Sequence, residues 1–436
     1  MRFFKKLFWK VPMPKSWKNK IHEKWYNNKL EKEENSFDVN LVDDQNSIND
    51  FAKQILSSYK CKSPFYKEYE EKSKVSSDVK LIAYYLTQYH PNKENDEWWG
   101  KGTTEWNNVN QAVPQFVGHY QPRRPGELGY YDLRIKENLQ RQIEIAKNYG
   151  VNCFCFYYYY FDNGERLLEA PLNMFLKDKS LDIEFCYCWA NENWTRRFSG
   201  TSNTILKEIS NNEETYKSFI HNIVDDLGDT RYYKINNQPV LIIYKPESIP
   251  NVKNTLEYWN KICFEKIQSN LYLIAVRGKN DTTDWVLQGF NAITEFQYRP
   301  VENYVKDITK DVKKINKEFK GRVYSYESIL DNLNYFNHLT STKIYPAIMP
   351  MWDNTARRNN CGVIFHGSTP SLYGQWLDKL ISIVRNNSSL DEKAIFINAW
   401  NEWGEGTYLE SDDYYGYAYL EETYQSLVRN RGEEDE

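Results

Sequence analysis

The sequence predicts an α/β fold in which strands and helices alternate to form a (β/α)8, or TIM, barrel. Eight short apolar runs recur from residue 80 onward, and stretches with helical periodicity lie between most of them. This alternation is typical of parallel strands joined by crossover helices. An open, doubly wound sheet is the competing interpretation. It is disfavoured because no G-x-G-x-x-G sequence follows any of the runs.

The predicted strands are apolar enough for burial on both faces. They cover residues 81–86, 151–157, 183–189, 240–244, 271–276, 292–296, 344–349 and 395–400. The predicted helices carry apolar residues at helical spacing. They include residues 133–149, 213–227, 256–267, 326–339 and 372–384.

Residues 1–79 are highly charged and weakly patterned, so we interpret them as an N-terminal extension of a catalytic domain at 80–430. Within the extension, Ile48, Phe51 and Ile55 fall on one face of a predicted helix at 46–58. Residues 1–10 are basic and aromatic and lack the features of a signal peptide. Their composition suits peripheral contact with a membrane and equally suits a solvated tail.

Composition excludes several classes of function. The net charge of -4 argues against a nucleic-acid-binding protein. The seven cysteines include two C-x-C pairs inside apolar runs and no C-x-x-C pair, which favours a reduced, cytoplasmic setting. Neither a Walker A loop nor a D-x-D sequence occurs, and the histidines lack metal-type spacing. We therefore predict neither a cofactor nor a metal.

Polar and aromatic residues concentrate after the predicted strands, where barrel enzymes place their active sites. The predicted substrate-binding residues are Tyr85, His90, Trp99, Glu105, Trp106, His119, Tyr120, Trp189, Asn191, Glu192, Trp194, Arg196, Asp353, Arg357, Asn401 and Trp403. For each tryptophan, packing within a loop is an alternative to stacking on a sugar. For Asp353 and Arg357, a structural ion pair is an alternative to binding of a phosphate or an acidic sugar.

The sequence N-A-W-N-E-W-G-E-G-T at 398–407 follows the last predicted strand. It places Glu402 and Glu405 three residues apart, at the C-terminal mouth of the barrel. Paired carboxylates beside aromatic rings are the minimum equipment for making or cleaving a glycosidic bond. We predict that this pair is catalytic. A purely structural role as hydrogen-bond acceptors, or a catalytic role for Glu192, are the alternatives.

Several stretches together resemble the WbsX-type polysaccharide-biosynthesis proteins and the related family 99 glycoside hydrolases, the endo-α-mannosidase type. They are Y-Y-L-T-Q-Y-H-P at 84–91, N-D-E-W-W-G-K-G at 95–102, G-H-Y-Q-P at 118–122, W-A-N-E-N-W at 189–194 and N-E-W-G-E-G-T at 401–407. The resemblance spans about residues 81–410. Thr103 and the tyrosine-rich stretch at 157–162 depart from the family pattern.

The resemblance implies a barrel enzyme that acts on an oligosaccharide or polysaccharide, free or lipid-linked. It further implies that Glu402 takes the proton of the sugar 2-hydroxyl, which attacks the anomeric carbon to give an anhydro-sugar. Glu405 then protonates the leaving oxygen, and configuration is retained.

Three hypotheses remain open from the sequence. The first is a retaining hydrolase or transglycosylase of surface-polysaccharide metabolism, and the second is a glycosyltransferase with a nucleotide- or lipid-linked donor. The third is a glycan-binding assembly protein without catalysis. The basic N-terminus and the cysteines favour a biosynthetic role at the cytoplasmic face of the membrane.

Overall fold

The structure of the chain is a computed structural model. It describes residues 45–431, apart from 61, 196–204, 208, 210–212, 279–280 and 297–300. The predicted contact of residues 1–10 with a membrane therefore lies outside the described residues.

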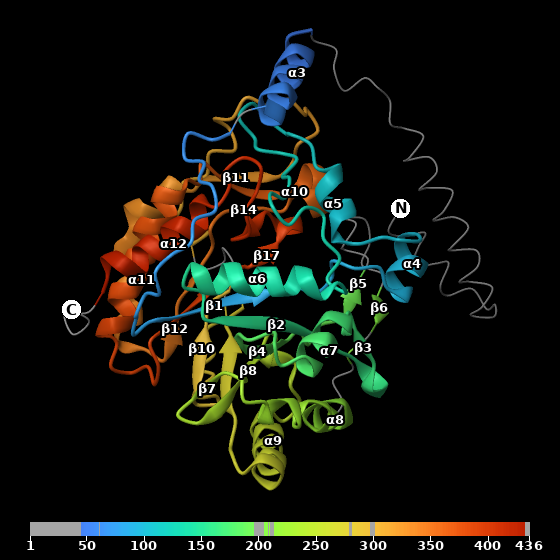
Figure 1. Cartoon of the computed structure of the whole chain (residues 1–436), viewed down its shortest axis with the longest axis vertical. Coiled ribbons are helices and arrows are strands. Elements are labelled where there is room, and N and C mark those ends of the chain that lie inside the picture. Colours follow the sequence, from blue (N-terminus) through green and yellow to red (C-terminus); the bar gives the residue numbers. More distant parts are fainter. Residues whose placement is uncertain are drawn as a thin grey trace, which may run out of the picture.

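Eight parallel strands form the core, as the sequence predicts (Figure 1). Their bounds differ from the predicted ones by a few residues at most. They are β1 (Lys80–Tyr85), β2 (Cys153–Tyr160), β4 (Glu184–Trp189), β8 (Gln238–Ile243), β9 (Tyr272–Val276), β10 (Ala292–Thr294), the interrupted strand β12 (Ile344–Tyr345) and β13 (Ala347–Ile348), and β16 (Ala394–Ile397).

The sheet closes on itself through the interrupted strand. Its order is β12-β10-β9-β8-β4-β2-β1-β16-β13, so the first and last segments are the two halves of one stretch of chain. Pro346 separates the halves because proline has no N–H to donate to a ladder. Its carbonyl still accepts a hydrogen bond from the amide of Phe396 at 3.0 Å. These contacts confirm the barrel.

Helices surround the barrel at four of the five predicted places as α-helices, and at the fifth as a 3-10 helix (Figure 1). Asn332 interrupts that 3-10 helix with φ −119°. Two helices that the sequence analysis did not predict, α7 and α12, complete the outer layer. The helices are α6 (Lys136–Asn148), α7 (Ala170–Lys177), α8 (Glu213–Ile223), α9 (Val252–Ile267), η5 (Glu327–Ser341), α11 (Pro370–Asn386) and α12 (Ala418–Arg429).

A small second sheet stands above the C-terminal mouth of the barrel (Figure 1). It consists of β11 (Arg322–Ser325), β15 (Val363–His366) and β14 (Trp352–Asp353), and Phe116 packs against its apolar face. A short helix, α10 (Thr355–Arg358), follows β14 directly. This sheet therefore fixes the segment that carries two predicted site residues, Asp353 and Arg357.

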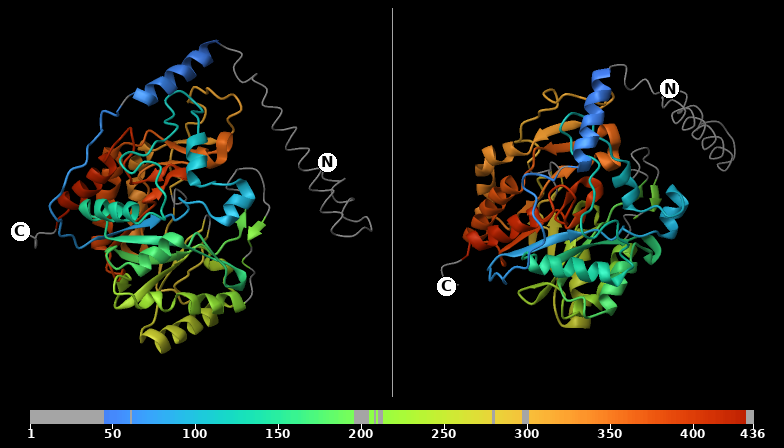
Figure 2. Two further views of the ribbon diagram at one scale, coloured as in Figure 1. Left: turned by 45° about the vertical axis from the view of Figure 1, so that its right-hand side comes forward. Right: turned by 45° about the horizontal axis from the view of Figure 1, so that its top comes forward.

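The predicted N-terminal helix is α3 (Gln45–Lys60), which lies above the small sheet (Figure 2). The side-chain amide of Gln54 accepts a hydrogen bond from the Gly118 amide at 2.9 Å and donates one to the His119 carbonyl at 3.3 Å. Residues 62–79 run along the barrel, where the Ser63 amide bonds to the Tyr414 carbonyl at 2.8 Å. Within the described part of the chain, no helix combines the length and hydropathy needed to cross a bilayer.

Candidate active site

The motif at 398–407 folds as a tight antiparallel hairpin just beyond β16. Glu402 pairs with Thr407 across it. Gly406 adopts φ +59°, a left-handed conformation that favours glycine. The hairpin consists of β17 (Asn401–Glu402), the 3-10 turn η7 (Trp403–Glu405) and β18 (Thr407–Tyr408).

Gly404 is required because an ion pair fills the space next to it. A Cβ atom there would lie 1.6 Å from Oε1 of Glu105 and 2.9 Å from Nε of Arg357. No rotation of an alanine methyl group relieves such an overlap. The glycine between the two motif glutamates thus lets Glu105 and Arg357 reach the turn.

Gly404→Ala is expected to destabilise the fold by about 1–3 kcal/mol, a usual range for overpacking, and to lower activity because it displaces Arg357. Thermal unfolding and turnover measure the two effects. Gly228→Ala is the matched control, since its Cβ would meet no atom closer than 3.7 Å. Equal behaviour of the two variants would contradict this account of Gly404.

Arg357 binds three glutamates at once. Its Nε lies 2.7 Å from Glu105, its Nη2 lies 2.6 Å from Glu402, and its Nη1 lies 3.1 Å from Glu405. Glu105 is fully buried, and Glu402 is 4% exposed. Charge-assisted bonds of this length fix a guanidinium rigidly. The two predicted catalytic carboxylates are therefore held by one cation, with Glu105 behind it.

The carboxylates outnumber the cation, and this controls their protonation. Burial raises the pKa of Glu402 to about 8, with a further upward push from Glu405 and Glu105, while Arg357 acts in the opposite direction. Burial also raises the pKa of Glu105 against the pull of Arg357. Repulsion between close carboxylates disfavours their simultaneous ionisation. The cluster therefore retains a proton near neutral pH.

Two tyrosines that the sequence analysis did not select face this cluster from β2. Charges on Glu402 act on both Tyr157 and Tyr159, and Arg357 acts on Tyr159. The ring of Tyr159 meets Trp194 edge-on at 5.0 Å. Tyr157 and Tyr159 are two residues apart, and alternate residues of a strand share one face. This spacing in the sequence could have predicted that both rings point into the barrel.

His119 and Asp353, the last residue of β14, form a buried pair. Nε2 of His119 lies 2.7 Å from Asp353, and its Nδ1 accepts the Gln115 amide at 3.0 Å. The proton therefore sits on Nε2. Asp353 also accepts bonds from Gln121 at 2.7 Å and from Thr355 at 2.6 Å. Burial raises the pKa of Asp353, but His119, Arg123 and the Thr355 hydroxyl together lower it below its usual range. The pair anchors the start of α10.

Asn401 ties the hairpin to the end of β1. Its amide oxygen accepts the Leu86 amide at 2.7 Å, and its amide nitrogen donates to the Leu86 carbonyl at 3.0 Å. The same nitrogen lies 3.3 Å from the hydroxyl of Tyr131. Asn401 is fully buried, so these contacts position Glu402.

Trp403 is held from below by Glu410, a buried residue that the sequence analysis did not select. Glu410 accepts bonds from Nε1 of Trp403 at 2.7 Å and from Gln142 at 2.6 Å. Burial raises the pKa of Glu410 to about 7. Gln142 in turn accepts from the hydroxyl of Tyr85 at 2.5 Å. Tyr85 and Trp403 thus belong to one network under the turn.

Four other predicted aromatic residues have packing contacts. Trp106 donates to the Tyr131 carbonyl at 2.8 Å. Trp189 is fully buried and stacks on a ring of α8 with centroids 3.8 Å apart. The hydroxyl of Tyr120 lies 3.3 Å from a carboxylate at 412. Trp99 is partly buried at the end of helix α4 (Lys93–Trp99).

The predicted polar residues of the other loops also contact neighbouring groups of the protein. Glu192 forms an ion pair with Lys245 at 2.7 Å, and Asn191 exchanges two 2.7 Å bonds with the Lys245 backbone. His90 is buried, with Nδ1 2.9 Å from a backbone carbonyl three residues earlier. Arg196 lies outside the described residues.

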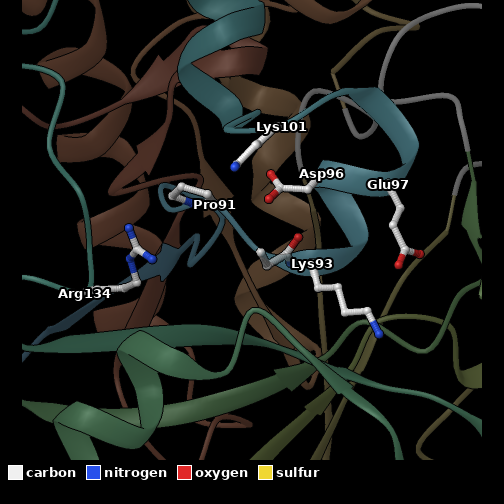
Figure 3. A pocket seen from close by; sticks show the side chains of 7 residues that line it. Pro91, Lys93, Asp96, Glu97, Lys101 and Arg134 are labelled. Atoms are coloured by element: carbon white, nitrogen blue, oxygen red, sulfur yellow. The ribbon is translucent and has the colours of Figure 1, made fainter.

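An open hollow of about 500 Å³ lies at the edge of the mouth, beside α4 (Figure 3). Lys101 and Asp96 lie on one side of it and Arg134 on the other (Figure 3). None of the predicted site residues lines it. Among the residues that the structure describes, no cluster of three or more His, Cys, Asp or Glu side chains is arranged to hold a metal ion.

Comparison with solved structures supports the barrel. A glycoside hydrolase-like protein aligns over 83% of this chain and 98% of its own, with a TM-score of 0.55 and 17% identity. The GH99 endo-α-mannosidase from Bacteroides thetaiotaomicron aligns over 81% of this chain and 98% of its own, with a TM-score of 0.50 and 14% identity. At these identities the likeness establishes the fold alone.

Comparison with sequences establishes the family. The protein WxcX of Xanthomonas campestris pv. campestris, which is uncharacterised, is 36% identical over 351 residues in each of two strains. The match covers 80% of this chain, and the chain spans about half the length of these curated relatives. The family model described as Glycosyltransferase WbsX matches residues 81–423. The chain therefore belongs to the WbsX glycosyltransferase family.

Proposed function

We propose that this protein makes or cleaves a glycosidic bond of a surface polysaccharide with retention of configuration, using Glu402 and Glu405. The observation that carries the proposal is the placement of both carboxylates on one guanidinium, Arg357, at the C-terminal mouth of the barrel. We further propose that it works at the cytoplasmic face of the membrane.

In the first step, Glu402 takes the proton of the sugar 2-hydroxyl, whose oxygen attacks the anomeric carbon. The bond to the leaving oxygen breaks as Glu405 gives that oxygen its proton. In the second step, water or an acceptor hydroxyl gives a proton to Glu405 and attacks the anomeric carbon, while Glu402 returns its proton to the 2-oxygen. Two inversions at one carbon retain the configuration. Arg357 holds both carboxyl groups in place throughout.

The raised pKa of Glu402 gives this scheme a defined pH dependence. With a glycosyl fluoride, which leaves without a proton, only the base has to be in the right protonation state, so kcat/KM is expected to rise with pH through about 8 and to level off above it. A pH profile between 5 and 10 measures this. A kcat/KM for the fluoride that stays constant or falls as pH rises through 8 would contradict the role of Glu402 as the base.

Turnover of α-mannosyl fluoride, with and without added acceptor sugars, tests the proposal. Fluoride release by the wild-type chain is expected, and a product that grows with acceptor concentration identifies transfer. Absence of fluoride release, together with transfer from a nucleotide- or lipid-linked sugar, would instead support the second candidate, a glycosyltransferase with that donor. The family description favours this second candidate.

A further inference from the structure

A buried glutamate, Glu410, bonds to the hairpin that carries both proposed catalytic carboxylates. It follows β18 by two residues and is 4% exposed. Its oxygens accept hydrogen bonds from Nε1 of Trp403 at 2.7 Å, from the hydroxyl of Tyr131 at 2.9 Å and from Nε2 of Gln142 at 2.6 Å. Three hydrogen bonds from uncharged donors therefore satisfy this buried carboxyl group.

The partners of Glu410 are all arranged to donate. An indole N–H can only donate. The side-chain oxygen of Gln142 already accepts the hydroxyl of Tyr85 at 2.5 Å, so its nitrogen faces Glu410. The hydroxyl of Tyr131 is 3.3 Å from Nδ2 of Asn401, accepts there, and gives its own proton to Glu410. These contacts fit an ionised carboxylate, which only accepts, and offer no acceptor to a proton on it.

The same donors connect Glu410 to both chain neighbours of Glu402. Trp403 follows Glu402 and bonds to Glu410 directly. Asn401 precedes Glu402 and is reached through Tyr131, whose hydroxyl contacts both Asn401 and Glu410. Both neighbours are buried. One carboxylate therefore restrains the side chains on each side of Glu402.

The backbone of these two neighbours has an anchor of its own. The hydroxyl of Tyr89 donates to the Asn401 carbonyl and accepts the Trp403 amide at 3.1 Å. Tyr89 is fully buried. Loss of Glu410 is therefore expected to loosen the side chains beside Glu402 and to leave the hairpin backbone in place.

We propose that Glu410, as a carboxylate, is a positioning residue for the base Glu402. It does not touch the substrate. It fixes the side chains of Asn401 and Trp403, so that the carboxyl group between them stays within reach of the sugar 2-hydroxyl. A proton transfer needs heavy-atom distances of about 2.6–3.2 Å, and a displacement of about 1 Å can cost about 100-fold in rate. This inference rests on the proposed function and deepens it.

The test replaces Glu410 with glutamine in the full-length chain. The amide has the shape of the carboxylate, but its NH2 group must face one of the three donors, so at least one hydrogen bond is lost. With α-mannosyl fluoride at pH 8, kcat is expected to fall about tenfold or more while KM stays within about twofold. Tyr131→Phe, which removes only the link to Asn401, is expected to give a smaller loss of the same kind.

Two control variants separate positioning from a general loss of stability. Glu295→Gln replaces another buried glutamate whose pKa burial raises to about 7, and whose charge acts on Tyr335 of η5. Tyr373→Phe removes a buried hydroxyl that lies 3.1 Å from the hydroxyl of Thr423, between α11 and α12. Both are expected to leave kcat and KM unchanged. Thermal unfolding shows whether each variant is folded.

Proton–nitrogen NMR of the indole groups tests the hydrogen bond independently of activity, with Trp403→Phe to assign the signal. The Trp403 indole proton is expected far downfield in the wild type, because its acceptor is charged, and upfield of that position in Glu410→Gln. An unmoved signal, an unchanged kcat in a folded Glu410→Gln, or a loss confined to KM would overturn the proposal.

Failure of the proposed function reads out separately, as fluoride release that Glu402→Gln does not change. Failure of the present inference leaves Glu402→Gln inactive and Glu410→Gln fully active. If the wild type releases no fluoride, the same variants are compared in transfer from a nucleotide- or lipid-linked sugar, where an unchanged kcat of Glu410→Gln likewise overturns the proposal.

Discussion

Replacement of Glu402 by glutamine is expected to lower kcat by about 10³-fold, within the range that general acid–base catalysis supplies. The amide keeps the shape of the side chain and still accepts a bond from Arg357, but it cannot take a proton. Glu405→Gln is expected to cost less with a glycosyl fluoride than with an O-glycoside, because fluoride leaves without a proton. Steady-state kinetics on both substrates measure the effects.

The pH dependence of the stability of Glu402→Gln shows whether this variant is folded. In the folded protein the pKa of Glu402 is raised to about 8. The Glu402 carboxyl group therefore contributes fully to stability below its unfolded pKa of about 4.5, and this contribution is lost as the pH rises from about 4.5 to 8. Glutamine does not titrate. Glu402→Gln is therefore expected to match the wild type in stability near pH 4.5 and to exceed it increasingly up to pH 8. An inactive variant that melts earlier than the wild type at pH 8 would contradict the burial argument.

Removal of Arg357 is expected to have the largest effect on stability. Arg357→Met leaves Glu105, Glu402 and Glu405 without their shared cation, and breaking a buried ion pair costs about 3–5 kcal/mol. Without the cation the pKa values of Glu105 and Glu402 rise further, so the loss grows with pH above about 4.5 and is smallest near pH 5. Thermal unfolding at pH 5 and pH 8 measures this.

Arg358→Met is the matched control, because Arg358 follows on the same short helix and is exposed. It is expected to stay within about 0.5 kcal/mol of the wild type. Equal stabilities of the two variants at pH 8 would show that Arg357 does not compensate the three glutamates.

The barrel was predictable because its strands are apolar runs buried on both faces. Only the strand at 344–349 departs from the prediction, where Pro346 interrupts the ladder. The small sheet was missed because β14 has two residues and β11 and β15 have four each, too few for a periodicity. Its importance is positional, since it carries Asp353 and α10.

The motif identified Glu402 and Glu405, but the sequence did not reveal what surrounds them. Glu105 and Arg357 are 252 residues apart, so their ion pair follows from the closure of the barrel and not from a local pattern. Tyr159 was noticed only as part of a tyrosine-rich stretch, and Glu410 lies outside every selected motif. Tyr159 is identified once the inward face of β2 is known, and Glu410 is identified once its buried hydrogen-bond donors are known.

The central claim is that Glu402 and Glu405 form a retaining catalytic pair. Proton NMR of the first product released from α-mannosyl fluoride, recorded before mutarotation, tests it most directly. The account predicts an α-configured product from the wild-type chain and no product from Glu402→Gln. A β-configured product, or an undiminished α-product from Glu402→Gln, would contradict it.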